Sequence, residues 1–505
     1  MEVNCKETVI ECYQVIYEEE VRCGESVESV VPDTLPDIGT VLSTCGTPLI
    51  RSKDLSAGRV RVDANIPVRV AYQPEEGEGV CVLDVNIPVS VSQEQAELDE
   101  NCVCTADLRL IALETKLLNP RKIAVRAEVC FALRCCRMGS ERFAGAPETA
   151  EWGIHVLTKE AALSPVRAVT EKTFVLTDEF RLPPERPEIG KLLCQKTLVE
   201  TEELKTAGTK VIVKGCAKSC LVYLSPEGTP AAVEFSTGFS QIVEAGTLPE
   251  DAGARATLLL SGAYYDPDAA DDGRTVGMEL HLVAQVTVCG REKALCLADA
   301  YSNLYALTLQ REERTACALS REVTLRETLR VTAETPTPVA EILSAWAEPG
   351  CATVSGGEVT LPLSVQIWYL CPAGLLHCLR RSFPLKLQTE LAAGERLALK
   401  CVSLQEVYAA PGSGGIELRI PAEVSADVIM ERTLPLVTGI DCDETQPLDL
   451  SAEPTLTLLR VSDGDDLWAL ARENHSALET IREVNGLDAE TGPWSRLLLI
   501  PKTLF

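Results

Sequence analysis

Residues 59–72 read RVRVDANIPVRVAY. Apolar residues occupy every second position from Val60 to Tyr72, and mostly polar or charged residues fill the positions between them. A period of two puts the apolar side chains on one side of an extended chain, so the pattern predicts a β-strand with one buried face. A turn follows at 74–77, where proline and glycine supply the backbone angles that turns require. A second alternating run over 80–91 completes a β-hairpin.

The same arrangement returns twice further along the chain. LPDIG at 35–39 precedes the first run, and RPEIG at 186–190 precedes an equivalent run that ends at Tyr223. Both landmarks are displaced by the same number of positions (187 − 36 = 151; 223 − 72 = 151). A third, more diverged run ends at Tyr369 and is followed by another Pro-x-Gly turn. The chain therefore consists largely of three repeats of one β-rich unit.

Each repeat also closes with a second hairpin. The three turns lie at 119–121, 266–268 and 411–415, and each precedes an apolar alternating run. About six or more short strands per repeat, with few stretches of helical period, predict a β-sandwich or an open barrel. We expect a mainly β protein with three tandem β-sandwich-like units at 1–148, 149–302 and 303–432, then a polar linker at 433–454.

The Pro-acid-Ile-Gly landmark is itself open to two interpretations. Pro36 and Pro187 fix φ, and Gly39 and Gly190 allow a turn or close packing. These residue types are the usual ones in turns, so a structural corner is favoured over a binding site.

Composition excludes several classes of function. The formal net charge of the 505 residues is −28, and the acidic residues are spread along the chain rather than gathered in blocks. Nucleic acid and anionic membrane surfaces attract basic patches, so we expect neither as a partner. The first residues lack the basic and apolar regions of a signal peptide, and no apolar stretch is long enough to span a membrane. The protein is expected to stay in the compartment where it is made.

The 21 cysteines do not keep one spacing from repeat to repeat, as a disulfide framework would. Many lie in apolar strand-like runs, where a free cysteine behaves as a small hydrophobic residue. The close pairs do not match the paired CxxC spacing of zinc sites, so no metal is expected. Cross-linking on later oxidation stays open as an alternative.

The last fifty residues follow a different pattern. A short strand over 458–461 precedes an acidic turn, and Asp465 is the expected N-cap of a helix that begins at Asp466. Ser476 and Glu479 have the spacing of a capping box for a second helix, which is expected to end at Asn485-Gly486. A closing strand covers 497–500. The predicted order is strand, helix, helix, strand, with Trp468 in the core.

This βααβ pattern closely resembles a LysM module over 455–505, on Gly464-Asp465, Leu467-Trp468, Ala471, Ile481, Asn485 and the final LLLIP. LysM modules usually bind N-acetylglucosamine polymers in a groove between two loops. The resemblance therefore implies that the groove residues are Asp463, Gly464, Asp465, Asp466, Leu487 and Trp494. Trp494 replaces the glycine usual in the family, and it suits either a sugar ring or a protein interface.

The repeats resemble the SPOCS domain of spore-forming Firmicutes, on LPDIG at 35–39, the alternating strand and Ile87-Pro88-Val89. SPOCS repeats followed by a LysM module are similar to spore coat morphogenetic proteins. That resemblance implies a protein of the mother-cell cytoplasm at the forespore surface. Its expected partners are a SpoIVA-like coat basement ATPase, bound by the LysM module, and other coat proteins. The alternative is binding to peptidoglycan of the cortex or cell wall.

No catalytic residues are predicted. The four histidines are far apart in sequence, and the chain has no Gly-x-Ser-x-Gly motif, no P-loop and no dinucleotide fingerprint. No cofactor is expected either, and the sequence favours a non-enzymatic assembly protein.

Overall fold

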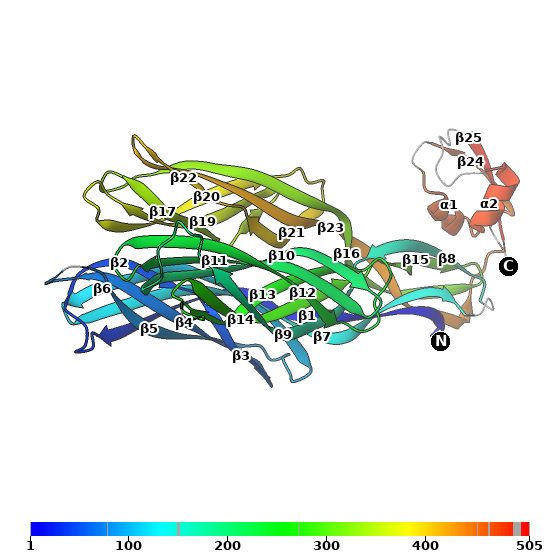
Figure 1. Cartoon of the computed structure of the whole chain (residues 1–505). Helices are drawn as coiled ribbons and strands as arrows, with labels where there is room; N and C mark the ends of the chain where they lie inside the picture. Colours follow the sequence, from blue (N-terminus) through cyan, green and yellow to red (C-terminus); the bar gives the residue numbers. More distant parts are fainter. Residues whose placement is uncertain are drawn as a thin grey trace.

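The computed structural model describes residues 2–77, 79–148, 152–270, 272–451, 453–462, 465–487 and 496–503. Within them the protein is mainly β, as the alternating runs predict, and the two helices both lie in the C-terminal module. Three β-sandwich heads lie side by side, and their longest strands continue into a common stem, with the small module beside it (Figure 1).

The first head consists of two antiparallel sheets. β4 is the central strand of one sheet, with β5 on one side and both β2 and β3 on the other. β7 is central in the second sheet, between β1 and β6. The alternating side chains from Val60 to Tyr72 pack against those of β7 from Ile123 to Phe131 in one core. The strands are β1 (Cys5–Val30), β2 (Ile38–Gly46), β3 (Leu49–Ser56), β4 (Arg59–Pro74), β5 (Cys81–Glu94), β6 (Cys102–Asn119) and β7 (Lys122–Pro147).

The second and third heads repeat this order. The predicted hairpins β11–β12 and β19–β20 are present, and β11 and β19 are again central strands. The strands of the second repeat are β8 (Ile154–Leu163), β9 (Val166–Arg181), β10 (Lys191–Ala207), β11 (Lys210–Leu224), β12 (Pro230–Glu244), β13 (Gly253–Asp266), β14 (Thr275–Cys289) and β15 (Glu292–Ser302). Those of the third are β16 (Tyr305–Ala333), β17 (Glu341–Pro349), β18 (Thr353–Ser355), β19 (Glu358–Leu370), β20 (Leu376–Gln388), β21 (Glu395–Leu404), β22 (Tyr408–Gly412) and β23 (Gly415–Pro447).

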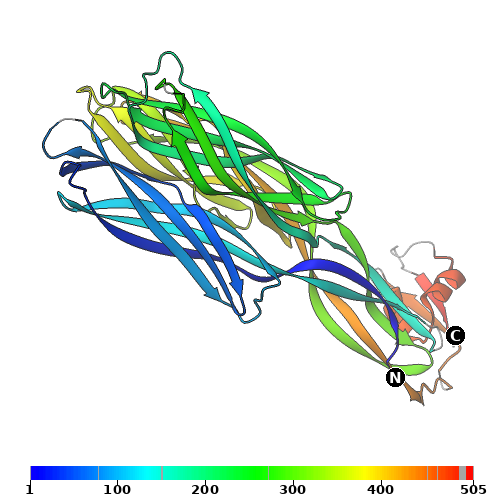
Figure 2. The same cartoon turned by 60° about the horizontal axis from the view of Figure 1, so that its bottom comes forward.

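The stem is built from one antiparallel ribbon of each repeat (Figure 2). The first ribbon is the outer part of β1 with β7, the second is β8 with β15, and the third is the outer part of β16 with β23. The register shifts between Val15 and Tyr17 in β1 and between Leu319 and Arg321 in β16. At the corresponding place the second repeat is interrupted at 164–165, between β8 and β9. A bulge or break bends a strand, so each repeat turns from head to stem at the same point.

Residues 433–447 differ from the linker that the sequence predicts. They form the last part of β23 and pair with β16 from Thr315 back to Tyr305. Leu436, Val437, Ile440 and Cys442 are buried in the stem. The polar composition of 441–447 concealed the strand, because its pairing partners, residues 305–308, are distant in sequence. Residues 448–455 connect the stem to the module.

The landmark is a structural corner in the first two heads. The Tyr72 hydroxyl donates to the Pro36 carbonyl at 2.9 Å, and the Tyr223 hydroxyl donates to the Pro187 carbonyl at the same distance. A Cβ on Gly190 would lie 2.8 Å from the backbone of Ser225 and Pro226, which explains the glycine. The tyrosine that ends each central strand thus fixes the preceding corner.

One buried ammonium joins all three heads. Lys196, on β10 of the second head, is 2% exposed. Its Nζ donates to the Gly46 carbonyl of the first head at 3.1 Å and to the Glu348 carboxylate of the third at 3.0 Å. A disulfide between Cys45 and Cys194, with Cα atoms 5.8 Å apart, links the first two heads beside it. The three heads are therefore joined in one rigid assembly and are not independent domains on a string of linkers.

Among the described residues, no helix has both the length and the apolar character that crossing a membrane requires.

Replacing Tyr72 with Phe should lower the free energy of unfolding by about 1 kcal/mol, because the buried Tyr72 side chain loses its hydrogen bond to the Pro36 carbonyl. Urea unfolding followed by circular dichroism measures the change. Tyr408→Phe is the matched control, since that side chain is exposed. Equal stability of the two variants would contradict the role of the tyrosine in fixing the corner.

Candidate functional site: the C-terminal module and its seat on the stem

The C-terminal module follows the order that the sequence predicts. Its elements are β24 (Leu456–Val461), α1 (Leu467–Glu473), α2 (Leu478–Asn485) and β25 (Arg496–Pro501). β24 and β25 form a two-stranded antiparallel sheet. Val461, Leu498 and Ile500 on its inner face pack against Ala471 and Ile481 of the helices.

The first helix begins one residue later than the sequence predicts. Asp466, not Asp465, is its N-cap, and its carboxylate accepts from the Trp468 backbone N–H at 3.0 Å. The Asp465 carboxylate instead accepts from the Ser462 N–H at 2.8 Å and closes the preceding loop. Either of two neighbouring acidic residues in a turn can serve as the N-cap, and the sequence alone does not show which one does. Both carboxylates therefore stabilise the loop that forms one predicted lip of the groove.

The second helix lacks the predicted capping box. Ala477 is its N-cap and makes no side-chain cap hydrogen bond, whereas Ser476 is completely buried and its hydroxyl donates to the Pro501 carbonyl. The serine is used for tertiary contact between helix and sheet instead of for capping. The predicted C-terminus is confirmed, because Gly486 has a left-handed conformation with φ of 55°.

Asn485 ties the end of α2 to the sheet. Its side-chain amide donates to the Leu499 carbonyl at 2.6 Å and accepts from the Leu499 N–H at 2.8 Å. Leu487, on the second predicted lip, is half-buried and packs against the module core. The predicted groove residues Asp463, Gly464 and Trp494 lie outside the described residues, so the structure places only Asp465, Asp466 and Leu487 of the set.

Trp468 is buried, as predicted. It also makes the contacts by which the module docks on the stem. Its side chain is 7% exposed, and its indole Nε1 donates to Asp299 on β15 at 2.8 Å. The ring packs on Tyr301 with centroids 4.8 Å apart at 63°. The Tyr301 hydroxyl donates to the Ser476 carbonyl at 2.6 Å. One strand of the second repeat thus holds both the first helix and the turn between the helices.

The Asp299 carboxylate accepts hydrogen bonds from the charged side chains at this interface. Besides Trp468, it accepts from Arg472 of α1 at 2.8 Å and from Arg311 of β16 at 2.5 Å. Burial alone would raise the pKa of the Asp299 carboxyl, but these hydrogen bonds and guanidinium groups outweigh burial and hold the pKa below its ordinary value. Asp299 therefore stays ionised and bridges the module to the stem.

Sequence reasoning missed Asp299, Tyr301 and Asn303. The last of these donates to the Thr503 carbonyl at 2.6 Å. A usable signal was present: the three polar residues alternate within the apolar run 294–303. An acid inside a buried strand requires a partner, so the run pointed to an interface.

The face of the module sheet opposite the helices is exposed and apolar. Leu456, Leu458 and Leu497 are 52%, 58% and 59% exposed. Leu458 pairs across the sheet with Leu499, and Arg460 pairs with Leu497, so all five residues share this face. We call Leu456, Leu458, Leu497 and Leu499 the leucine face.

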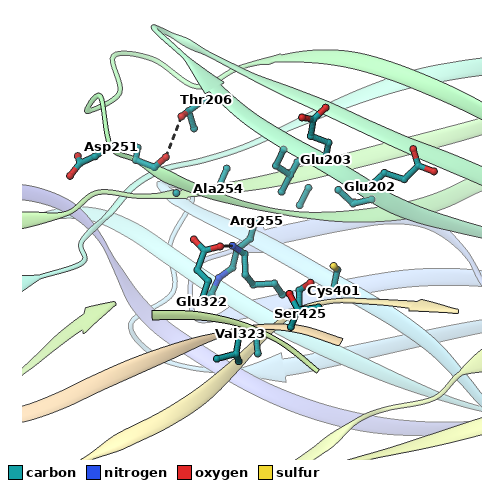
Figure 3. Close-up of a pocket in the computed structure, with 18 of the residues that line it drawn as sticks. Glu202, Glu203, Thr206, Asp251, Ala254, Arg255, Glu322, Val323, Cys401 and Ser425 are labelled. Atoms are coloured by element: carbon teal, nitrogen blue, oxygen red, sulfur yellow. Dashed lines mark hydrogen bonds and ion pairs between the residues drawn. The ribbon is translucent and has the colours of Figure 1, made fainter. Parts of the chain in front are cut away.

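A polar cleft of about 350 Å³ lies between the second and third heads (Figure 3). Glu202, Glu203 and Asp251 line it from the second head, and Glu322 and Lys400 line it from the third. Its charges are largely matched, since Glu322 pairs with Lys400 at 3.4 Å and with Arg291 at 3.8 Å. Such paired charges are typical of a solvent-filled interface between two domains.

No known protein-family model matches the chain, and no curated protein matches it at a significant level.

Asp299→Asn should loosen the module from the stem, because Arg472 of the module loses the carboxylate that it shares with Arg311 of the stem. We expect the docked state to lose about 2 kcal/mol, as for hydrogen bonds to charged groups. Protease cleavage within 448–454 should then accelerate at least several-fold. Asp84→Asn, which removes an exposed acid paired with Arg69 on the first head, is the control. Unchanged cleavage in Asp299→Asn would refute the bridging role.

Docking of the module on the stem should also weaken as the pH falls. Because the folded-state pKa of Asp299 is lowered, its contribution is fully present above the ordinary carboxyl pKa of about 3.9 and is lost as pH falls through the lowered value. Hydrogen exchange of the Trp468 indole N–H between pH 7 and pH 3 measures this. His155 lies near Tyr301 and titrates in both proteins, so the difference between wild type and Asp299→Asn isolates the carboxylate. Parallel pH profiles would contradict the assignment.

Proposed function

We propose that this chain is a non-enzymatic spore coat assembly adaptor, similar to the morphogenetic protein SipL. Its three sandwich units are SPOCS-like repeats, and its C-terminal module is LysM-like. The module docks on a SpoIVA-like ATPase at the forespore surface, in the mother-cell cytoplasm. The repeats then present surface for the recruitment of other coat proteins.

The observation that carries this proposal is the way the module is held. Trp468 fixes the helical side of the module to Asp299 and Tyr301 of the stem. On the opposite side of its sheet, Leu456, Leu458 and Leu497 of the leucine face are exposed. Exposed apolar clusters on a soluble domain mark protein interfaces more often than carbohydrate sites, which are lined by polar groups and aromatic rings. A protein partner therefore suits this module better than a glycan.

The interlocked heads support the presenting role. Lys196 and the Cys45–Cys194 disulfide hold the three repeats in one fixed arrangement, so their outer sheets form a surface of defined shape. The heads lie at one end of the molecule and the module beside the stem at the other (Figure 1). A body with its anchor at one end and repeated surfaces at the other suits an adaptor.

Retention assays with the full chain test the proposal. The protein is incubated with a SpoIVA-like ATPase on beads and, separately, with insoluble peptidoglycan. We expect saturable binding to the ATPase and none to the glycan. Leu458→Glu should abolish ATPase binding, whereas Val175→Glu should not, because Val175 is equally exposed but lies on the second head.

Two outcomes would contradict the proposal. Saturable retention on peptidoglycan without ATPase binding would favour the alternative function, a peptidoglycan-binding protein, and loss of that retention in Trp494→Ala would assign it to the predicted groove. Binding to neither would remove the adaptor role altogether. ATPase binding that survives Leu458→Glu but not Trp494→Ala would keep the function and move the contact from the leucine face to the groove.

A further inference from the structure

A lysine, a glutamate and a glutamine meet at the contact between the first and second heads. Lys53 lies on β3 of the first head, and Glu171 and Gln285 lie directly opposite each other on β9 and β14 of the second. The Lys53 Nζ donates to the Glu171 carboxylate and, at 2.9 Å, to the side-chain oxygen Oε1 of Gln285. An amine, a carboxylate and a carboxamide are thus held in direct contact across two heads.

Both reacting groups are fixed by further hydrogen bonds. Gln285 is 3% exposed, its Nε2 donates to the Ala106 carbonyl of β6 at 2.6 Å, and its Oε1 accepts from the Ala106 N–H at 2.9 Å. The Lys53 Nζ also donates to the Cys104 carbonyl at 2.8 Å. Because a C=O bond is about 1.23 Å long, Nζ lies within ~4.1 Å (2.9 + 1.23) of the Gln285 carbonyl carbon Cδ.

The triad lies beside an apolar contact between the two heads. Leu259 of β13 and Val283 of β14 belong to the second head but are buried in the hydrophobic core of the first. The Lys53 side chain is 14% exposed, whereas the Glu171 side chain is 47% exposed. The amine and the amide are therefore shielded from the water that would hydrolyse an amide bond, and the carboxylate can exchange protons with solvent.

We propose that Lys53 and Gln285 form an intramolecular isopeptide bond, with Glu171 as the group that carries protons between them. The reaction is a transamidation, in which the lysine amine replaces the amide nitrogen of the glutamine. The bond joins the first and second heads in addition to the Cys45–Cys194 disulfide, and unlike that disulfide it survives reduction. This inference does not depend on the proposed function.

The atoms balance without a co-reactant. Glu171 accepts a proton from the Lys53 ammonium group, which frees the lone pair on Nζ. Nζ then attacks Cδ of Gln285, and the negative charge that develops on Oε1 is stabilised by the Ala106 N–H. Glu171 passes the proton to Nε2, the Cδ–Nε2 bond breaks, and ammonia leaves. A second proton passes from Nζ to the ammonia, so ammonium is released and one proton remains on the new amide nitrogen.

Peptide mapping of the full chain tests the bond, after its cysteines have been reduced and alkylated. Trypsin does not cleave after a lysine whose amine is part of an amide bond. The cross-linked chain therefore yields residues 52–59 joined to residues 275–291. We expect tandem mass spectrometry to find this pair, lighter than the sum of the two peptides by the mass of one ammonia. Its yield should rise while the folded protein is incubated at neutral pH.

Glu171→Gln tests the role of the carboxylate, because the amide keeps the size of the side chain but does not accept the lysine proton. We expect the linked pair to form at least about tenfold more slowly in this variant. Glu179→Gln is the matched control, since Glu179 is an exposed acid on the same strand, and it should form the bond at the wild-type rate. Circular dichroism shows whether each variant folds.

The wild-type map decides the bond itself, even if a variant does not fold. Recovery of free 54–59 and of unmodified 275–291 from the incubated folded protein, with no linked pair, overturns the proposal. Loss of ammonia at another position, without a peptide that joins Lys53 to Gln285, overturns it equally. A link that forms as fast in folded Glu171→Gln as in the wild type refutes the assignment of Glu171 as the proton carrier.

Discussion

The rest of the structure depends on long strands that each extend from a head into the stem. β1, β7, β16 and β23 run without interruption from a head into the stem, so one ladder of backbone hydrogen bonds serves two hydrophobic cores. A strand that continues in this way cannot rotate about a hinge without breaking ladder bonds in a buried environment. The heads therefore keep a fixed orientation to the stem, and the bulges in β1 and β16 set the angle.

Contacts between repeats add a second level of order. Lys196 reaches a carbonyl of the first head and a carboxylate of the third, while Gln285 of the second head bonds both the N–H and the carbonyl of Ala106 in the first. Such buried polar groups carry a large penalty when unpaired, so they specify one arrangement of the heads and disfavour others. The docking of the module follows the same logic, because Asp299, which also binds Arg311 within the stem, satisfies Trp468 and Arg472 only when the module is docked.

The C-terminal module shows where local sequence signals succeed and fail. Gly486 ends α2 as predicted, because only the local backbone angle decides that position. Asp465 and Ser476 were expected to be capping residues, yet one closes a loop and the other bonds the closing strand. A capping residue competes with tertiary partners for the same side chain, and these partners are distant in sequence. The interpretation of 433–447 as a linker was incorrect for a similar reason, since the pairing partner of this segment begins at Tyr305.

The sequence by itself determined the strands, their inward faces, the hairpins and the threefold repeat, because a period of two and the turn residues act over a few neighbouring positions. It also determined the order of elements in the module. Only the tertiary structure decided that the repeats share a stem, that Lys196 and two cysteines lie at the junction of the heads, and that β15 carries the module. These features arise from contacts between residues far apart in the chain, and no local pattern of side chains encodes which distant surfaces will meet.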